Sequence, residues 1–338
     1  MSISPVPSAG GFRLKLADFP DGAVAINLST GAYFRLNPTA CDIGRQLQAG
    51  QPVTAIAEAL ASRYALPADQ AEAAVTAVLA SLQAVEPPQG GNPLSFRRDG
   101  ERWLLHWDAR AVLAVDECGL DVSAVTAISV EEAAAYLLWA TPHLLALQGR
   151  LVLHAAAVRR HEAVTAFCGP SGMGKTTLAR TFTAAGAAPV SEDLVVVQLS
   201  PQGVAVALEA EAWLRGWAAE QAARLASGES VATQDLASNL PTTFAPLSAI
   251  WFIERLDQAQ PTLAKTRFTA PDGLARLLHN SFAELPLPTV WEPLFDSLAQ
   301  LAAQVPLFHV ALPHGLDILE QAVVAYSRMV NGNAPPSV

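Results

Sequence analysis

Basic residues are scarce in this chain. The 338 residues include 21 Lys and Arg against 31 Asp and Glu, which gives a formal net charge of −10. Proteins that bind nucleic acid through its phosphates need clustered Lys and Arg. Because the net charge is negative and residues 1–88 contain few basic residues and no cluster of Lys and Arg, the composition argues against nucleic acid as a partner.

Cysteines and long apolar runs are also few. Cys41, Cys118 and Cys168 are scattered and lack metal-ligand spacing, which is typical of a reducing compartment. Residues 133–149 are uncharged, but they are shorter than the ~20 residues of a membrane span, so we expect a buried helix. No basic region followed by an apolar run marks a signal peptide. We therefore expect a cytoplasmic protein without a membrane partner.

One of the three lysines falls in a glycine-rich segment. The segment reads Gly169-Pro170-Ser171-Gly172-Met173-Gly174-Lys175-Thr176. It fits G-x-x-x-x-G-K-T, the Walker A phosphate-binding loop. The glycines let backbone N–H groups turn toward phosphate oxygens, the lysine adds positive charge, and the threonine offers a hydroxyl to Mg²⁺. An apolar run at 163–168 enters the loop and a helical pattern at 177–185 leaves it, which predicts phosphate at a helix N-terminus. We therefore expect ATP and Mg²⁺ at residues 169–177, Thr177 included.

A histidine and two acids flank this loop. His154 lies in the apolar run before it, and Glu192 and Asp193 open the apolar run after it. Strand, loop, helix and strand make one βαβ unit, which brings the acids beside Mg²⁺ and the outer phosphate. Neighbouring residues on a strand point to opposite faces. Both acids therefore reach one site only if the strand ends or bends there.

Together these residues resemble the catalytic domain of HPr serine kinase/phosphorylase. The resemblance implies a P-loop α/β kinase domain at residues 94–330 and a possible homo-oligomer. By the same resemblance, Glu192 is the general base on an acceptor hydroxyl, Asp193 binds Mg²⁺ or orients the base, and His154 and Lys175 lie near the transferred phosphate. The two acids are also able to exchange these roles.

The chain departs from that family in its C-terminal part. The family has a basic, glycine-containing signature that contacts its protein substrate, whereas here no Lys or Arg occurs between Arg224 and Arg255. We therefore expect an acceptor other than HPr. Arg255 ends an apolar run at 249–255 and is a candidate either for stabilising transferred charge or for a structural ion pair.

Residues 1–88 predict a separate α+β module. Turn signals at 21–22 and 30–31 separate three short apolar runs. Apolar residues spaced by three and four then predict three helices. The order of three strands and three helices is winged-helix-like. The predicted strands are 12–16, 23–28 and 32–36, the predicted helices are 39–48, 53–64 and 68–84, and residues 86–93 are the predicted linker.

Residues 25–37 and 56–60 resemble the PqqD family, the peptide-recognition element of pathways that modify ribosomally made peptides. The resemblance implies that a leader peptide adds as a strand along residues 32–36 and faces residues 71–82. Alternatively, the apolar side chains there simply form the core. The implied peptide-binding residues are Tyr33, Phe34, Arg35, Val75 and Leu79.

The two resemblances together predict an ATP-dependent kinase that phosphorylates a hydroxyl, expected to be serine, of a precursor peptide whose leader is bound by residues 1–88. Two alternatives remain open from the sequence. One is a nucleotide-gated or ATPase-coupled peptide carrier, and the other is a kinase for a small hydroxylated molecule. The donor, ATP or pyrophosphate, is also open.

Overall fold

The computed structural model describes residues 13–83, 94–107, 110–116, 118–255, 262–282, 288–313 and 315–332. Two compact units make up the chain. The first comprises residues 1–92, 269–279 and 283–303, and the second comprises 93–268, 280–282 and 304–338. The predicted linker at 86–93 lies outside the described residues. The first unit thus includes two segments from the C-terminal half of the chain, residues 269–279 and 283–303.

The first unit begins with the predicted three strands and three helices. The strands are β1 (Leu14–Phe19), β2 (Gly22–Asn27) and β3 (Tyr33–Leu36), and the helices are α1 (Pro38–Gln48), α2 (Val53–Tyr64) and α3 (Ala68–Gln83). The strands form an antiparallel sheet in the order β1-β2-β3. Asn37 caps α1 by accepting the amide of Ala40 at 2.8 Å, and proline follows as the first helical residue. Apolar side chains from the sheet and the three helices form the core of this unit.

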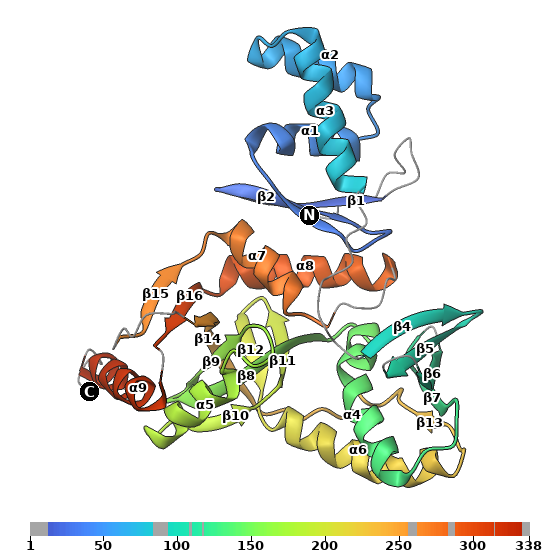
Figure 1. The fold of residues 1–338 in the computed structure, drawn as a ribbon, viewed down its shortest axis with the longest axis vertical. Helices are drawn as coiled ribbons and strands as arrows, with labels where there is room; N and C mark the ends of the chain where they lie inside the picture. The colour runs from blue at the N-terminus through green and yellow to red at the C-terminus, as the bar shows by residue number, and fades with distance from the viewer. Residues whose placement is uncertain are drawn as a thin grey trace. The chain divides into compact units, whose positions relative to one another are not determined.

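Two later helices, α7 (Ala270–His279) and α8 (Pro288–Gln304), also belong to the first unit. Figure 1 shows them in orange beside the blue sheet of β1–β3. α7 contacts all three strands, with Pro271 beside Gly22. Trp291 on α8 covers Gly31, whose φ of +76° defines the turn before β3. The sheet therefore packs against helices from both ends of the sequence.

The second unit contains a mixed sheet that carries the glycine-rich loop. Among the described residues it has eight strands in the order β10-β8-β11-β12-β14-β16-β15, with β9 paired to β14 and β8. β9, β14 and β16 run parallel to one another, and β8 is antiparallel to β9, β10 and β11. The strands are β8 (Leu151–Arg160), β9 (Ala163–Cys168), β10 (Ala188–Ser191), β11 (Leu194–Ser200), β12 (Gly203–Ala207), β14 (Phe244–Arg255), β15 (Ala264–Arg267) and β16 (Leu307–Leu312).

Helices α5 (Lys175–Ala184) and α9 (Leu316–Gly332) pack against each other and share a core cluster with this sheet. The cluster is rich in aromatic rings. Phe167 and Phe182 stack with centroids 5.6 Å apart, and Trp251 meets Tyr326 edge to face at 5.2 Å. Such pairs add about 0.5–1.5 kcal/mol each beyond burial, so the cluster holds α5 against the sheet.

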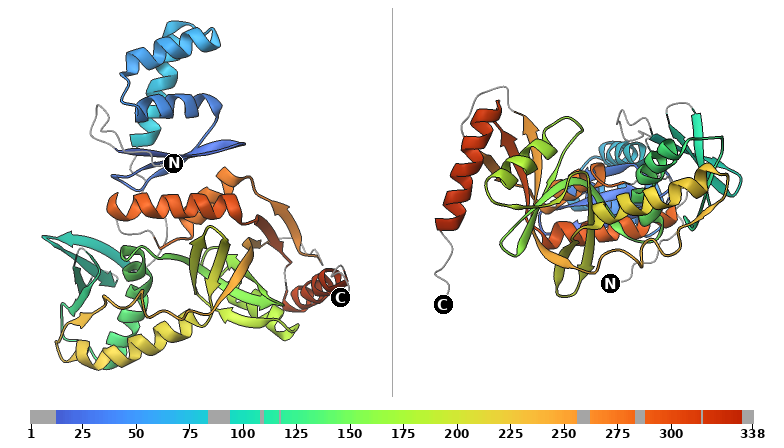
Figure 2. Two further views of the ribbon diagram at one scale, coloured as in Figure 1. Left: turned by 180° about the vertical axis from the view of Figure 1, so that it is seen from behind. Right: turned by 90° about the horizontal axis from the view of Figure 1, so that it is seen from below.

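A second, antiparallel sheet completes this unit, in the order β13-β7-β6-β5-β4. Helices α4 (Val130–Leu147) and α6 (Ala210–Ala226) lie side by side (Figure 2). Ser129 and Glu132 form a capping box on α4, which is the predicted buried helix. No described helix has the length and apolarity to cross a membrane. The strands are β4 (Leu94–Asp99), β5 (Arg102–Trp107), β6 (Arg110–Asp116), β7 (Asp121–Ala124) and β13 (Val231–Ala232).

Candidate functional site

The glycine-rich loop joins β9 to α5 in a conformation that requires glycine. Gly169, Gly172 and Gly174 have φ values of +151°, +78° and +100°. A Cβ at Gly169 would also lie 3.0 Å from the backbone oxygen of Ile253 on the neighbouring strand. Helix α5 begins at Lys175 rather than at the predicted Thr177. Both threonines, Thr176 and Thr177, are therefore in its first turn, where free amides and the helix dipole favour an anion.

Lys175 is buried, and its ammonium is held by the loop itself. Nζ donates to the backbone oxygens of Gly169 at 2.8 Å and Pro170 at 3.3 Å. Burial lowers the pKa of Lys175, although Asp193 acts in the opposite direction. Burial also raises the pKa of Cys168 to about 12, so this cysteine remains a thiol. The lysine is thus the positive charge at the centre of the loop.

The loop lies at the carboxyl ends of the parallel strands β9, β14 and β16, where open α/β sheets commonly bind ligands. Arg255 ends β14, and its Nη2 lies 3.8 Å from the position of a Cβ built on Gly174. The guanidinium is therefore close to the loop.

The predicted strand that opens with two acids is in fact two strands. β10 ends at Ser191, β11 begins at Leu194, and Glu192 and Asp193 form the bend between them. The backbone oxygen of Asp193 accepts the amide of Ala155, a β8 residue whose other neighbour is Cys168 on β9. Because neighbouring strands are about 4.8 Å apart, the acidic bend lies roughly two strand spacings from the start of the loop.

The two acids have different surroundings. Glu192 Oε1 lies 3.2 Å from Nη2 of Arg180 on α5, and both side chains are more than half exposed. Asp193 acts electrostatically on both Lys175 and His154, raising the pKa of each against the effect of burial. Asp193 is therefore the acid associated with the loop lysine.

His154 lies on β8, opposite Leu194. Its backbone amide donates to the oxygen of Asn280 at 2.9 Å, and its ring centroid is 5.7 Å from that of Phe282. Burial lowers the pKa of His154, and the positive charge of Lys175 lowers it further. The imidazole is therefore neutral near pH 7. The sequence does not connect Asn280 or Phe282 with His154, because no local signal places them beside β8.

Glu211, in the first turn of α6, contacts the acidic bend, which the sequence did not reveal. This carboxylate is only 7% exposed and binds the acidic bend. Its Oε2 accepts the amides of Glu192 at 2.7 Å and Asp193 at 3.2 Å. The sequence offers one signal for Glu211, namely Arg215 four residues later, at the spacing of an ion pair on a helix. In the structure Arg215 Nη2 donates to Glu211 Oε1 at 2.6 Å.

The residues predicted to bind a peptide lie on β3 and α3 of the first unit. Tyr33, Phe34 and Leu79 are partly buried, and Phe34 and Leu79 pack on the core. Val75 has no exposed surface and is part of the core. Arg35 is exposed and pairs with Asp272 on α7 at 2.7 Å. β3 is an edge strand whose ladder partner, within the described part of the chain, is β2.

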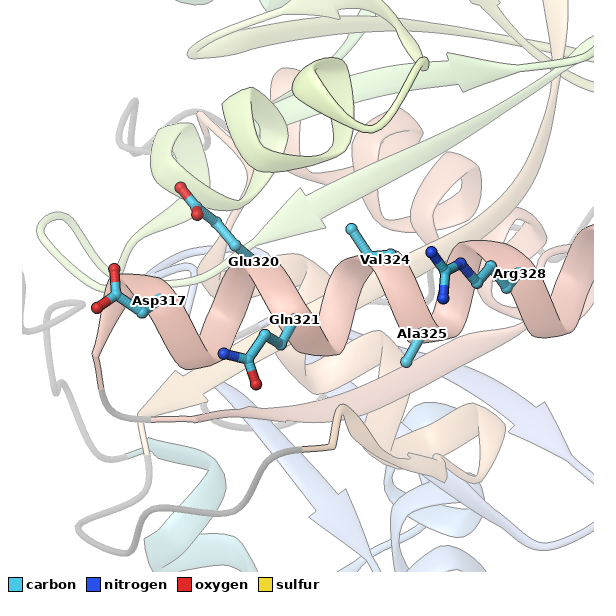
Figure 3. A pocket seen from close by; sticks show the side chains of 6 residues that line it. All are labelled: Asp317, Glu320, Gln321, Val324, Ala325 and Arg328. Carbon is cyan, nitrogen blue, oxygen red and sulfur yellow. The ribbon is translucent and has the colours of Figure 1, made fainter.

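The structure also describes a surface hollow and the arrangement of metal-ligating side chains. A hollow lined by Asp317, Glu320, Gln321, Val324, Ala325 and Arg328 lies along the exposed face of α9 and includes none of the candidate residues (Figure 3). Among the described residues, no group of three or more His, Cys, Asp and Glu is arranged to hold a metal ion. Thr176 and Asp193 still suit Mg²⁺, because this ion usually takes one or two carboxylates together with water and substrate phosphates.

The two parts of the chain differ in what they resemble. Residues 22–86 match the family model of coenzyme PQQ synthesis protein D (PqqD). Among solved structures, the Hpr(Ser) kinase/phosphatase from Coxiella burnetii aligns with 54% of this chain and 99% of its own, at 10% identity and a TM-score of 0.25. A likeness of that size says nothing about activity. No curated protein matches the chain. The chain thus contains, at residues 22–86, a domain similar to PqqD.

Proposed function

We propose that this protein is a kinase that transfers the γ-phosphoryl group of ATP to a hydroxyl of a peptide bound by its first unit. The observation that carries the proposal is the loop geometry. Three glycines with positive φ, a buried Lys175 and the first turn of α5 converge at the carboxyl ends of three parallel strands, with Asp193 close enough to act on the lysine. The PqqD-like domain on the same chain supports a peptide as the acceptor.

The donor would be bound mainly by backbone. Backbone amides of residues 169–177, Pro170 excepted because proline has no N–H, would surround the phosphates. Lys175 would exchange the oxygens of Gly169 and Pro170 for phosphate oxygens. Thr176 and Asp193 would hold Mg²⁺, which neutralises charge on the outer phosphates. Arg255, close to Gly174, would add a second positive group.

Glu192 remains our candidate for the proton acceptor. The acceptor hydroxyl would give its proton to this carboxylate while its oxygen bonds to the γ-phosphorus. The bond between that phosphorus and the bridging oxygen would break, and ADP would leave with the electron pair. The exposed position of Glu192 suits an acceptor as large as a peptide. The neutral His154 would donate a hydrogen bond to a phosphate oxygen.

The first unit would hold the leader of the substrate. An extended peptide would add to the open edge of β3, using its backbone for affinity and the side chains of Tyr33, Phe34, Arg35 and Leu79 for specificity. Val75 would support this surface from within the core. Holding the leader raises the effective concentration of the tethered serine, to about the mM range for short flexible linkers.

The test is to incubate the full chain with Mg-ATP and the short peptide encoded beside its gene, and then to measure the peptide mass. We expect a gain of one phosphate with the wild type and with Lys265→Ala, and none with Lys175→Ala. Lys265 is a matched control, because it is the other lysine of the second unit and packs on Phe308 instead. Phosphate release without any change in peptide mass would contradict the proposal and favour a nucleotide-gated carrier.

A peptide without its leader tests separately whether the first unit binds the substrate. Its phosphorylation at low concentration should be much slower than that of the full precursor, since tethering is lost. Equal rates for the two peptides would remove the first unit from the mechanism.

A further inference from the structure

Glu211 gathers five donor contacts on one buried carboxylate. On Oε2, the amides of Glu192 and Asp193 donate at 2.7 and 3.2 Å, and the hydroxyl of Ser191 lies at 2.7 Å. On Oε1, Arg215 donates through Nη2 at 2.6 Å and Nε at 3.2 Å. Oε2 therefore binds the acidic bend, and Oε1 binds Arg215 on helix α6.

We infer that Glu211 is a positioning residue for phosphoryl transfer, fixing the bend that carries Glu192 and Asp193. The inference rests on the proposed function. Glu211 itself touches neither the glycine-rich loop nor, in our proposal, the substrate. It acts through the backbone of Glu192 and Asp193, to which our proposal assigns the acceptor hydroxyl and Mg²⁺.

The bend needs such an acceptor for a geometric reason. In an extended strand, successive N–H groups point in opposite directions. Here the successive amides of Glu192 and Asp193 both point to one oxygen, which is possible only because the chain bends between β10 and β11. Without the Glu211 carboxylate, the amides of Glu192 and Asp193 would lose their hydrogen-bond acceptor. The bend would then lose the two hydrogen bonds that fix its conformation.

The environment keeps this carboxylate charged and in place. Burial acts to raise the pKa of Glu211, but hydrogen bonds from Arg215, Ser191 and the two amides outweigh it, so the pKa is lowered. Its place in the first turn of α6 also favours negative charge. A charged acceptor makes shorter and stronger hydrogen bonds than a neutral amide, which suits a group that must fix a loop.

Glu211→Gln is the sharpest variant, because it preserves size while replacing one acceptor oxygen by an NH₂ donor. That donor must face either Arg215 or the two amides. Glu220→Gln, an exposed change on the same helix, is the matched control. We expect Glu211→Gln to lower kcat for peptide phosphorylation on the order of 10- to 100-fold, as misplacement of a catalytic group by about 1 Å does. Because Asp193 is displaced together with Glu192, nucleotide binding should also require more Mg²⁺.

Hydrogen exchange provides a readout that does not depend on activity. The amides of Glu192 and Asp193 should exchange faster in Glu211→Gln than in Glu220→Gln, while those inside α5 stay protected. Glu211→Asp retains the charge on a shorter arm and should give an intermediate kcat. It also serves as the test variant if Glu211→Gln does not fold.

Two results would overturn the inference. One is that Glu211→Gln shows the same hydrogen exchange and the same kcat as Glu220→Gln. The other is that the activity of Glu211→Gln falls only in proportion to the amount of folded protein. If the wild type transfers no phosphate, the proposed function fails, and the Mg²⁺ dependence of ADP affinity becomes the readout. An unchanged Mg²⁺ dependence in Glu211→Gln then overturns the inference as well.

Discussion

Arg35 Nη1 lies 2.7 Å from Asp272 Oδ1, an ion pair that joins edge strand β3 to helix α7 within the first unit. Asp272 lies in a segment that is bounded on both sides by residues of the second unit. Lys15 on β1 makes similar links to α8, through Glu292 at 3.4 Å and Asp296 at 2.5 Å. The unit that contains the PqqD-like domain is thus completed by helices from the C-terminal half.

Gly31→Ala should destabilise the first unit strongly. A Cβ at this position would overlap the indole of Trp291, and the φ of +76° is itself costly for a side chain, by about 1–2 kcal/mol. Gly100→Ala is the control, since it has a φ of +60° and no neighbour within 4 Å. Overpacking commonly adds about 1–3 kcal/mol, so urea unfolding should separate the two variants by that amount. Equal losses would mean that Trp291 does not cover Gly31 in solution.

Lys15→Met should cost more stability than Arg35→Met. The side chain of Lys15 is 13% exposed and faces two acids, whereas that of Arg35 is 51% exposed and faces one. Exposed pairs contribute about 0.2–1 kcal/mol, and removing a partner from a buried pair costs about 3–5 kcal/mol, so Lys15 should fall between these values. Urea unfolding at low and high salt measures both. A larger loss for Arg35→Met would contradict the assignment of α8 to this sheet.

Glu192→Gln and Asp193→Asn should impair different steps. Asp193 acts on Lys175 and His154, so Asp193→Asn should weaken Mg²⁺-dependent nucleotide binding. Glu192 lies at the surface beside Arg180, so Glu192→Gln should leave nucleotide binding intact and lower kcat by about 10²–10⁴-fold, the usual contribution of a general base. Titration with a fluorescent ADP analogue and steady-state kinetics check the two effects. The reverse pattern would exchange the roles of the two acids.

His143 should make the second unit sensitive to acid. Burial lowers its pKa from 6.5 to about 3, so between these values the unfolded chain binds a proton that the folded chain does not. The free energy of unfolding therefore falls as the pH drops from about 6.5, by up to about 5 kcal/mol at pH 3. His154 contributes in the same direction, since its pKa is also lowered.

His143→Leu should flatten this dependence, measured as the difference in urea midpoint between pH 7 and pH 4. His279→Gln, on an exposed histidine of α7, is the control and should behave as the wild type. An unchanged acid slope in His143→Leu would assign the sensitivity to other groups.

The sequence predicted secondary structure correctly where the pattern within one segment is enough to specify it. Helix α2 was predicted with its observed bounds because three- and four-residue apolar spacing is uninterrupted there, and the 163–168 strand was predicted because it leads directly into the glycine-rich loop. The sequence placed Glu192 and Asp193 at the start of a strand and left open whether the chain bends there; the structure shows a bend between β10 and β11. The carboxylate that accepts both amides at this bend belongs to Glu211 on another element, which no local signal indicates.

The sequence by itself determined the glycine-rich loop, because the backbone requirement of each glycine and the charge of Lys175 are properties of consecutive residues. It also determined the three strands and three helices of the PqqD-like domain. Only the tertiary structure decided that Glu211 holds the acidic bend, that Asn280 and Phe282 contact His154, and that α7 and α8 complete the first unit. The physical reason is that these contacts join residues far apart in the chain, and pairing of strands and packing of faces, rather than local spacing, brings them together.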